Sequence, residues 1–284
     1  MALYGSNFTY DGKSSETYSV VMCTDGAIES VPMGLSRELI VGEMTAHRPT
    51  SNYYGVKYSE VLSFEITITK KENDPFTRQE VRDINKWLTS VKTPSVLSVV
   101  NEDTESEQVD YIGLFTGVDN AYASGIVMLT YNFQTNAPYA WSKVQTSTYT
   151  SESTLDTTID CDSDEINEYI YPTITIEANA GTTITLTNKS DLSMDVNSMK
   201  ITFPQAASTV YIDSKYHKIY YINSSGEQQM LTLDEIGIST DDANKTGILS
   251  IYWFRLLSGE NAINISGNCT LTFSYRVPRK VGAY

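Results

Sequence analysis

The last strand of this chain constrains its fold more than any other segment. Between Cys269 and Arg276 the side chains alternate strictly. One side carries Leu271, Phe273 and Tyr275, and the other carries Thr270, Thr272, Ser274 and Arg276. Alternation with a period of two is the mark of a half-buried β-strand. Tight turns are expected before it at 258–261 and 266–268, so the segment 254–276 predicts the closing part of a β-sandwich and resembles no catalytic motif.

Short segments with strand character recur from Asp160 onward. Strands are expected at 168–177, 182–187, 199–203, 208–212, 218–222, 247–254 and 270–277. Turn signals rich in Asn, Gly and Ser separate them, as at 179–181 and 223–226. Short strands divided by turns are typical of an antiparallel sandwich, which we place at 160–284. The Ser- and Thr-rich stretch 144–159 is poor in core residues, so we expect a linker with at most one edge strand.

Residues 1–143 are expected to form a domain of strands with one helix. The clearest strand is 57–71, whose core face is predicted to hold Leu62, Phe64, Ile66 and Ile68. Further strands are expected at 18–22, 31–41, 95–100, 110–115 and 126–133, with a loop at 47–55 and a solvated acidic hairpin tip at 101–108. This pattern predicts a mainly β domain.

The one predicted helix follows a break at 73–75. Thr77 and Glu80 have the spacing of a capping box, in which each residue satisfies a free backbone N–H of the other. Apolar residues then recur at helical spacing, at Val81, Ile84, Trp87, Leu88 and Val91. Pro94 is expected to end the helix.

Charge and cysteine content exclude several classes of protein. The net charge is −15, with 11 basic and 18 acidic residues through Lys143 and 9 and 17 after it. Neither half has the basic cluster that direct nucleic-acid binding needs. Cys23, Cys161 and Cys269 form neither a disulfide framework nor a zinc pattern, so free thiols are expected. No Sec signal is apparent, and no apolar run approaches the roughly 20 residues of a membrane span.

No motif predicts a catalytic, cofactor or metal site. His47 and His217 have no nucleophile motif beside them, and surface positions are expected. Asp160, Asp162 and Asp164 resemble the start of a calcium loop. However, Glu165 and Tyr171 stand where such a loop needs glycine and a bidentate glutamate. A glycosidase with paired carboxylates remains an alternative that no particular pair supports.

Six segments, taken in order, resemble a known family. They are FTYDGKSS at 8–15, the strand at 62–70, the capped helix FTRQEVRDINKWLTSV at 76–91, YPTITIEANAGTTITLTN at 171–188, VYID at 210–213 and LLSGENAINISGNCTLTFSYR at 256–276. Together they resemble the distal tail protein (Dit) family of long-tailed, non-contractile (siphovirus) bacteriophages. The resemblance extends over nearly the full chain and rests on the order and spacing of the segments.

This resemblance implies a mainly β fold in two domains. The N-terminal domain, 1–143, would be β-sandwich- or barrel-like with one α-helix, and would form the ring that continues the tail tube. The C-terminal domain, 160–284, would be a galectin-like antiparallel β-sandwich. Galectin-type sugar sites use a His-Asn-Pro-Arg run and a Trp-Gly-x-Glu strand, and neither is present, since Phe254 follows Trp253.

The function implied is that of a structural virion protein. Six copies would form a ring that joins the tail tube to the tail tip and its receptor-binding apparatus. The implied partners are the tail tube protein, the tail-associated fibre or lysin hub protein, and receptor-binding or side-fibre proteins attached through the C-terminal domain. Genomic DNA would pass through without specific binding, because an acidic channel repels the duplex. The protein would assemble in the host cytoplasm, act at the tail tip of the virion, and not insert into membranes.

Tyrosines point to a contact between subunits. The chain has 20 Tyr against 8 Phe, and Tyr is enriched where proteins meet. We expect the loop 48–58, with Arg48, Tyr53, Tyr54 and Tyr58, to reach a neighbouring subunit. The main alternative to a hub is a lectin-like carbohydrate-binding adhesin on a virion or cell surface, and an enzyme is a third class.

Overall fold

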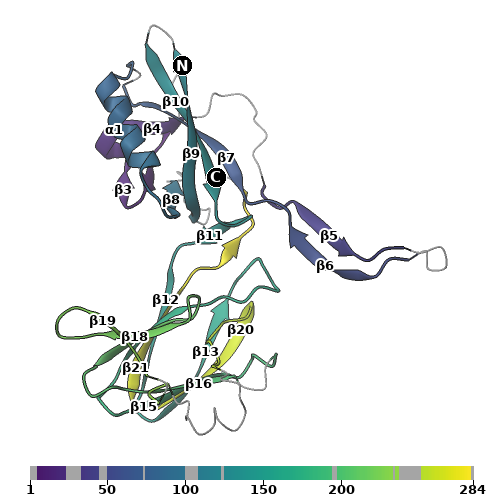
Figure 1. Cartoon of the computed structure of the whole chain (residues 1–284), viewed down its shortest axis with the longest axis vertical. Coiled ribbons are helices and arrows are strands. Elements are labelled where there is room, and N and C mark those ends of the chain that lie inside the picture. The colour runs from purple at the N-terminus through teal and green to yellow at the C-terminus, as the bar shows by residue number, and fades with distance from the viewer. Residues whose placement is uncertain are drawn as a thin grey trace. The chain divides into compact units, whose positions relative to one another are not determined.

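The computed structural model consists mainly of β-strands (Figure 1). It describes residues 5–23, 33–44, 50–72, 74–99, 108–122, 125–193, 197–232, 234–236 and 251–282. The chain divides into two compact units, one formed by Met1–Lys143 together with Pro278–Tyr284, and the other by Val144–Val277. We call these unit 1 and unit 2. No helix in the described part of the chain is long and apolar enough to span a membrane.

Unit 1 is built on one large antiparallel sheet. Its elements are β1 (Gly5–Ser6), β2 (Phe8–Tyr10), β3 (Lys13–Ser14), the 3-10 helix η1 (Ser15–Tyr18), β4 (Val20–Cys23), β5 (Arg37–Val41), β6 (Tyr53–Tyr58), β7 (Ser63–Lys70), α1 (Arg78–Thr89), β8 (Ser95–Val99), β9 (Val109–Tyr122), β10 (Ile126–Thr135), β11 (Ala140–Ser142) and β22 (Pro278–Arg279). The strand order is β1-β4-β7-β10-β9-β8-β2-β3, with β11 joining β9 to β22. β5 and β6 form a separate two-stranded sheet.

The predicted core face of the first domain is confirmed. Leu62, Phe64, Ile66 and Ile68 are all buried in the core of unit 1. The single strand expected at 57–71 is wrong, because β6 and β7 are separate strands. The reason is a change of partner: Lys57 pairs with Glu38 in β5, whereas Ser63 pairs with Gln134 in β10. A period-two pattern shows which face is buried but not which strand lies alongside.

Helix α1 begins as its sequence predicts. The Thr77 backbone N–H donates to Glu80 Oε2 at 2.7 Å, and the Glu80 N–H donates to Thr77 Oγ1 at 3.3 Å. Ile84, Trp87 and Leu88 form its buried face. The Trp87 indole N–H donates to the Tyr10 carbonyl at 3.1 Å, which ties the helix to β2.

Unit 2 is a sandwich of two antiparallel sheets. Its strands are β12 (Gln145–Ser151), β13 (Thr154–Cys161), β14 (Thr173–Glu177), β15 (Thr183–Asn188), β16 (Ser198–Thr202), β17 (Thr209–Asp213), β18 (Lys218–Ile222), β19 (Gln228–Met230), β20 (Gly259–Ser266) and β21 (Cys269–Tyr275). The sheet orders are β12-β21-β14-β17-β18-β19 and β13-β20-β15-β16.

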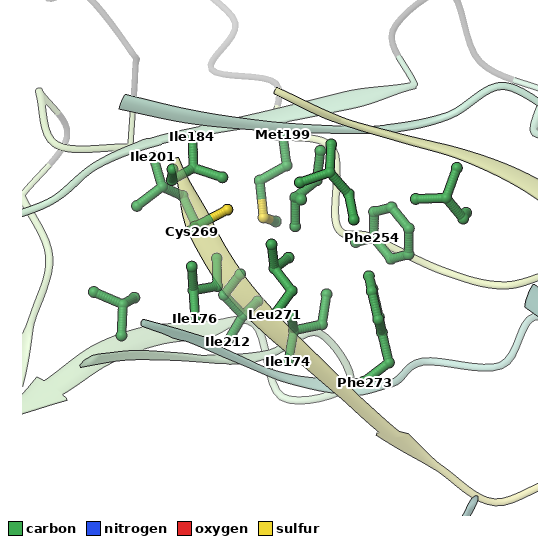
Figure 2. Close-up of a cluster of buried hydrophobic side chains, with 14 of the residues drawn as sticks. Ile174, Ile176, Ile184, Met199, Ile201, Ile212, Phe254, Cys269, Leu271 and Phe273 are labelled. Atoms are coloured by element: carbon green, nitrogen blue, oxygen red, sulfur yellow. The ribbon is translucent and has the colours of Figure 1, made fainter. Parts of the chain in front are cut away.

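The core of unit 2 lies between these sheets. Figure 2 shows Ile174, Leu271 and Phe273 of the larger sheet facing Ile184, Met199 and Ile201 of the smaller one. Leu271, Phe273 and Tyr275 are buried, as the alternation in the last strand predicts.

Two expectations for this region are wrong. Residues 144–159 do not form a linker, because β12 pairs with β21 over seven residues and β13 pairs with β20 over eight. Their threonines are β-branched and suit strands, and Thr148 Oγ1 lies 3.0 Å from Thr272 Oγ1 on the neighbouring strand. The turn expected at 258–261 is also wrong, because β20 already begins at Gly259.

The C-terminal segment returns to unit 1. β22 pairs with β11, with Ala140 opposite Arg279, and the Tyr111 hydroxyl donates to the Gly282 carbonyl at 3.0 Å. The sequence predicts a second domain running to residue 284, whereas Pro278–Tyr284 clusters with unit 1. Unit 2 is therefore an insertion between two segments of unit 1.

Candidate interaction surface

An exposed hairpin of unit 1 is the main candidate for a functional surface. We call β5, β6 and the residues between them the hairpin arm, 37–58. Among the described residues its two strands pair only with each other, from Arg37 opposite Tyr58 to Val41 opposite Tyr53. Figure 1 shows this ribbon apart from the large sheet of unit 1. Every described residue of β5 is exposed, so the arm contributes little to the core.

One face of the arm is apolar. Residues paired across an antiparallel hairpin lie on the same side, and successive residues alternate sides. Leu39 therefore shares a face with its partner Val56, and Val41 shares it with its partner Tyr53. Leu39 and Tyr53 are 62% and 63% exposed, and Val41 and Val56 are exposed as well. A contiguous apolar stripe of this kind makes this face of the arm a candidate contact surface.

The opposite face of the arm is more polar. Lys57 Nζ and Glu38 Oε2 form an ion pair at 3.0 Å. The ring of Tyr54 lies against Gly42, where an added Cβ would meet the ring at 3.0 Å. Asn52 Nδ2 donates to the Tyr54 hydroxyl at 3.3 Å, so the ring is held by contacts within the arm.

A β-bulge explains why the two neighbouring tyrosines lie on different faces. Ile40 pairs with Gly55 and Val41 pairs with Tyr53, which leaves Tyr54 as an extra residue on β6. Gly55 has a φ of +137°, a region that glycine adopts readily. The extra residue keeps Tyr53 on the apolar face and moves Tyr54 to the other one.

The base of the arm is anchored to unit 1. Tyr58 is half-buried, and its ring lies edge-on to Tyr139 with centroids 6.3 Å apart. Gly34 has a φ of +65°, and a Cβ there would lie 2.4 Å from the Pro138 carbonyl oxygen. Ser59 Oγ and Ser36 Oγ are hydrogen-bonded at 2.8 Å. These contacts fix where the arm leaves the unit.

Three of the four residues predicted for the interface lie among the described residues, and they occupy different parts of the arm. Tyr53 and Tyr54 are exposed, on opposite faces, and Tyr58 lies at the base. Arg48 lies outside the described residues. Sequence reasoning missed Leu39, Val41 and Val56, because their shared face becomes visible only when 37–41 is paired with 53–58.

Unit 2 holds a buried ion pair between Asp191 and Arg255 that stabilises its structure. Asp191 is fully buried and accepts from Arg255 Nε at 2.6 Å and from the Tyr252 hydroxyl at 3.0 Å. The Arg255 guanidinium lies 3.8 Å from the centroid of the Tyr169 ring. Burial raises the pKa of Asp191, but hydrogen bonds from Arg255 and Ser193 outweigh it and lower the pKa to about 2. Asp191 is therefore a permanently charged partner of Arg255 at neutral pH and is poorly suited to act as a base.

Of the two histidines, His217 lies among the described residues. The His217 ring stacks on Trp253 with centroids 4.8 Å apart, and His47 lies outside the described residues. Among the described residues, no group of three or more His, Cys, Asp or Glu side chains is placed to hold a metal ion. The three cysteines are buried, and burial raises the pKa of the Cys269 thiol to about 11.

Comparison with family models accounts for almost the whole chain. Residues 3–137 match the model described as phage tail protein N-terminal domain. Residues 139–275 match the model described as phage tail C-terminal domain. No curated protein matches the chain.

Solved structures share the fold at low sequence identity. The SPP1 Dit protein, described as a paradigm of the hub adsorption apparatus in phages that infect Gram-positive bacteria, is 14% identical with a TM-score of 0.60, over 96% of this chain and 99% of that one. A chain of the phage P2 baseplate, in its activated conformation with Ca, is 10% identical with a TM-score of 0.58, over 98% and 99%. A chain of the same baseplate with Sr is 10% identical with a TM-score of 0.56, and the match covers 97% of this chain and 99% of that one. The likeness extends over both units.

Proposed function

The chain belongs to the phage tail proteins built from these N- and C-terminal domains, and we propose that it is the distal tail protein, a structural component of the baseplate hub. Six copies form a ring that joins the tail tube to the tail tip and its receptor-binding apparatus. The mainly β fold in two units and its likeness to a hub protein along the full chain support this proposal. The role is structural and not enzymatic.

The observation that carries the proposal is the uncovered apolar face of the hairpin arm. A protein partner would bury the exposed side chains of this face, which are Leu39, Val41, Tyr53 and Val56. Full burial of a large apolar side chain contributes about 1.5–3 kcal/mol of favourable free energy. A projecting arm meets a different surface on the next copy, which makes the contact heterologous. Heterologous contacts close into rings when the rotation between copies allows it. The arm is thus the proposed contact between neighbouring subunits, with Tyr53 and Tyr54 on its two faces and Tyr58 at its base. Arg48, which lies outside the described residues, belongs to the same proposed contact.

Charge supports the passage of DNA through such a ring. A net charge of −15 per chain gives six copies a strongly negative field, which repels the phosphate backbone. Genomic DNA would pass without binding. The tail tube protein would stack on one side of the ring and the fibre or lysin hub protein on the other.

Unit 2 is the proposed attachment point for further components. It is a complete sandwich with its own core, as expected for a galectin-like domain that presents receptor-binding or side-fibre proteins. The protein would then be found at the tail tip of the virion, after assembly in the host cytoplasm.

Native mass spectrometry and negative-stain microscopy test the ring. The wild-type protein is expected to form six-membered rings at micromolar concentration, alone or with the tail tube protein. The double variant Leu39→Ser, Val56→Ser removes the centre of the apolar face, and we expect it to be monomeric. Because both side chains are exposed, the fold should survive, which circular dichroism checks.

Lys57→Ser is the matched control. It lies on β6 beside Val56 but faces the other way, and its ion pair with Glu38 is exposed and weak. Its rings should be indistinguishable from wild type. Persistent monomers of the wild-type protein, or rings of unchanged stability in the double variant, would contradict the proposed interface.

A further inference from the structure

Unit 1 contains a cleft that the proposed ring contact does not use. It lies between the β2–β3 turn, η1 and helix α1, and has a volume of about 980 Å³. Of its thirteen lining residues, nine carry charged or hydroxyl side chains, two are aromatic and two are aliphatic. Ligand sites are concave and usually combine an apolar or aromatic lining with a few convergent polar groups, and this cleft is richer in polar side chains than most such sites.

Three stacked aromatic rings lead from the core to this cleft. Trp87 is nearly parallel to Phe8, with centroids 5.5 Å apart and an interplanar angle of 12°. It is also nearly parallel to Tyr18, at 4.5 Å and 7°. Phe8 and Trp87 are buried, whereas Tyr18 is half-buried and lines the cleft. Tyr18 is thus the solvent-facing end of a rigid stack, and its ring is fixed before any ligand arrives.

Donors and acceptors surround this ring. Asp11 has one carboxylate oxygen engaged by the Ser95 hydroxyl at 2.8 Å, and Asp83 accepts from Gln79 at 2.9 Å. Lys13 and Lys86 also line the cleft, and within the described residues neither has an ion-pair partner. The cleft therefore offers carboxylates and free ammonium groups at the same time.

This lining favours one class of ligand. Three carboxylates against two ammonium groups disfavour phosphates and nucleic acids. Two aliphatic side chains give too little apolar surface for a lipid or an apolar peptide. A sugar suits a cleft that combines an aromatic ring with mixed polar groups. Its C–H face packs on the ring, and its hydroxyls both donate and accept hydrogen bonds. We propose that this cleft is a carbohydrate site for a neutral oligosaccharide, with Tyr18 as the stacking platform.

The neighbouring side chains then take defined roles. Asp11 and Asp83 accept from sugar hydroxyls, and Lys86 donates to a ring or hydroxyl oxygen. The site lies on unit 1, whereas a galectin-type sugar site would lie on the C-terminal sandwich. It is also independent of the ring, because none of the apolar residues of the hairpin arm lines the cleft.

Titration calorimetry and saturation-transfer NMR with the full chain test the site. The probes are chitotetraose, cellotetraose and maltotetraose, at up to 5 mM. We expect one of them to bind with a Kd between about 10 μM and 1 mM, typical of a single open site. Tyr18→Ala should weaken binding at least tenfold, and Lys86→Ala and Asp83→Asn several-fold each.

Arg82→Ala is the matched control for Lys86→Ala. Both residues are exposed cations on α1, but Arg82 does not line the cleft. Thermal unfolding checks that Tyr18→Ala remains folded, and the two exposed substitutions keep the test valid if it does not. The proposal is overturned if no probe binds at 5 mM, or if Lys86→Ala and Arg82→Ala have equal effects. Loss of rings with sugar binding retained would count against the proposed function alone.

Discussion

At the scale of single residues, the most consequential contact is the pair of Asp191 and Arg255. Asp191 accepts from Arg255, Ser193 and Tyr252, and Arg255 is only 12% exposed. A buried pair of this kind adds little compared with apolar residues of the same size, but breaking it is costly because one charge stays without a partner. The pair thus ties residues 191–193 firmly to residues 252–255.

Asp191 should make unit 2 sensitive to acid. Its folded pKa of about 2 lies below the ordinary value, so its stabilisation is present above about pH 4 and is lost as the pH falls from 4 to 2. The shift corresponds to roughly 2 kcal/mol. Asp191→Asn should lower the free energy of unfolding at pH 7 by roughly 2–4 kcal/mol and flatten its pH dependence between 4 and 2. Urea unfolding at each pH measures this.

Asp156→Asn is the control, because Asp156 pairs with Lys189 at the surface. Its hydrogen bonds from Lys189 and Asn264 also lower the pKa, but solvent screens the pair. Equal losses in the two variants would show that burial of the Asp191 pair does not matter.

At the scale of elements, the start of helix α1 is where sequence and structure agree best. Thr77 and Glu80 satisfy each other's backbone N–H groups, and Lys70 binds Glu80 at 2.7 Å. The hydrogen bonds from Lys70 and from the Thr77 backbone lower the pKa of Glu80 to about 2, despite a small opposing effect of burial. The capping box is local chemistry that the sequence alone reveals, whereas the ion pair with Lys70 comes from strand β7 and depends on the fold.

Thr77→Ala should destabilise unit 1 by about 1 kcal/mol, since it removes the capping hydroxyl. Thr89→Ala is the comparison at the other end of α1, where the hydroxyl donates to the Asn85 carbonyl within the same helix at 2.6 Å. That bond offers the helix no cap, and its loss should be nearly neutral. Denaturant unfolding of both variants measures the difference. Equal unfolding midpoints for Thr77→Ala and Thr89→Ala would contradict the role of the cap.

Local sequence patterns predicted which face of a strand is buried, but they did not predict which strands pair with each other. The core positions Leu62 and Phe273 follow from alternation alone. The linker at 144–159 was wrong because a Thr-rich edge strand and a polar linker have the same composition, and only pairing with β20 and β21 distinguishes them. The apolar face of the arm needs a bulge at Tyr54 that no propensity reveals. The sugar cleft needs Tyr18 and Trp87 to meet across 69 residues of sequence.

At the scale of the whole molecule, the division into units does not follow the order of the chain. Unit 1 needs Pro278–Tyr284, which the sequence assigns to the second domain. Removing residues 278–284 should therefore loosen β9 and β11, because β22 and the partner of the Tyr111 hydroxyl are lost. Hydrogen exchange at 109–115 and 140–142 should rise, while the core of unit 2 stays protected.

Removing only residues 283 and 284 is the control, since it keeps β22 and Gly282. Exchange in β9 and β11 should then match the wild type. If both truncations behave alike, or if the longer one changes only unit 2, the C-terminal segment does not complete unit 1.

The insertion of unit 2 into unit 1 has a consequence during synthesis. The ribosome makes Pro278–Tyr284 after all of unit 2, so unit 1 cannot be finished while unit 2 is still being translated. A chain interrupted anywhere within 144–277 carries an incomplete unit 1, even though residues 1–143 are intact. If unit 1 makes the proposed contact between subunits, we expect such a fragment to be left out of the assembly.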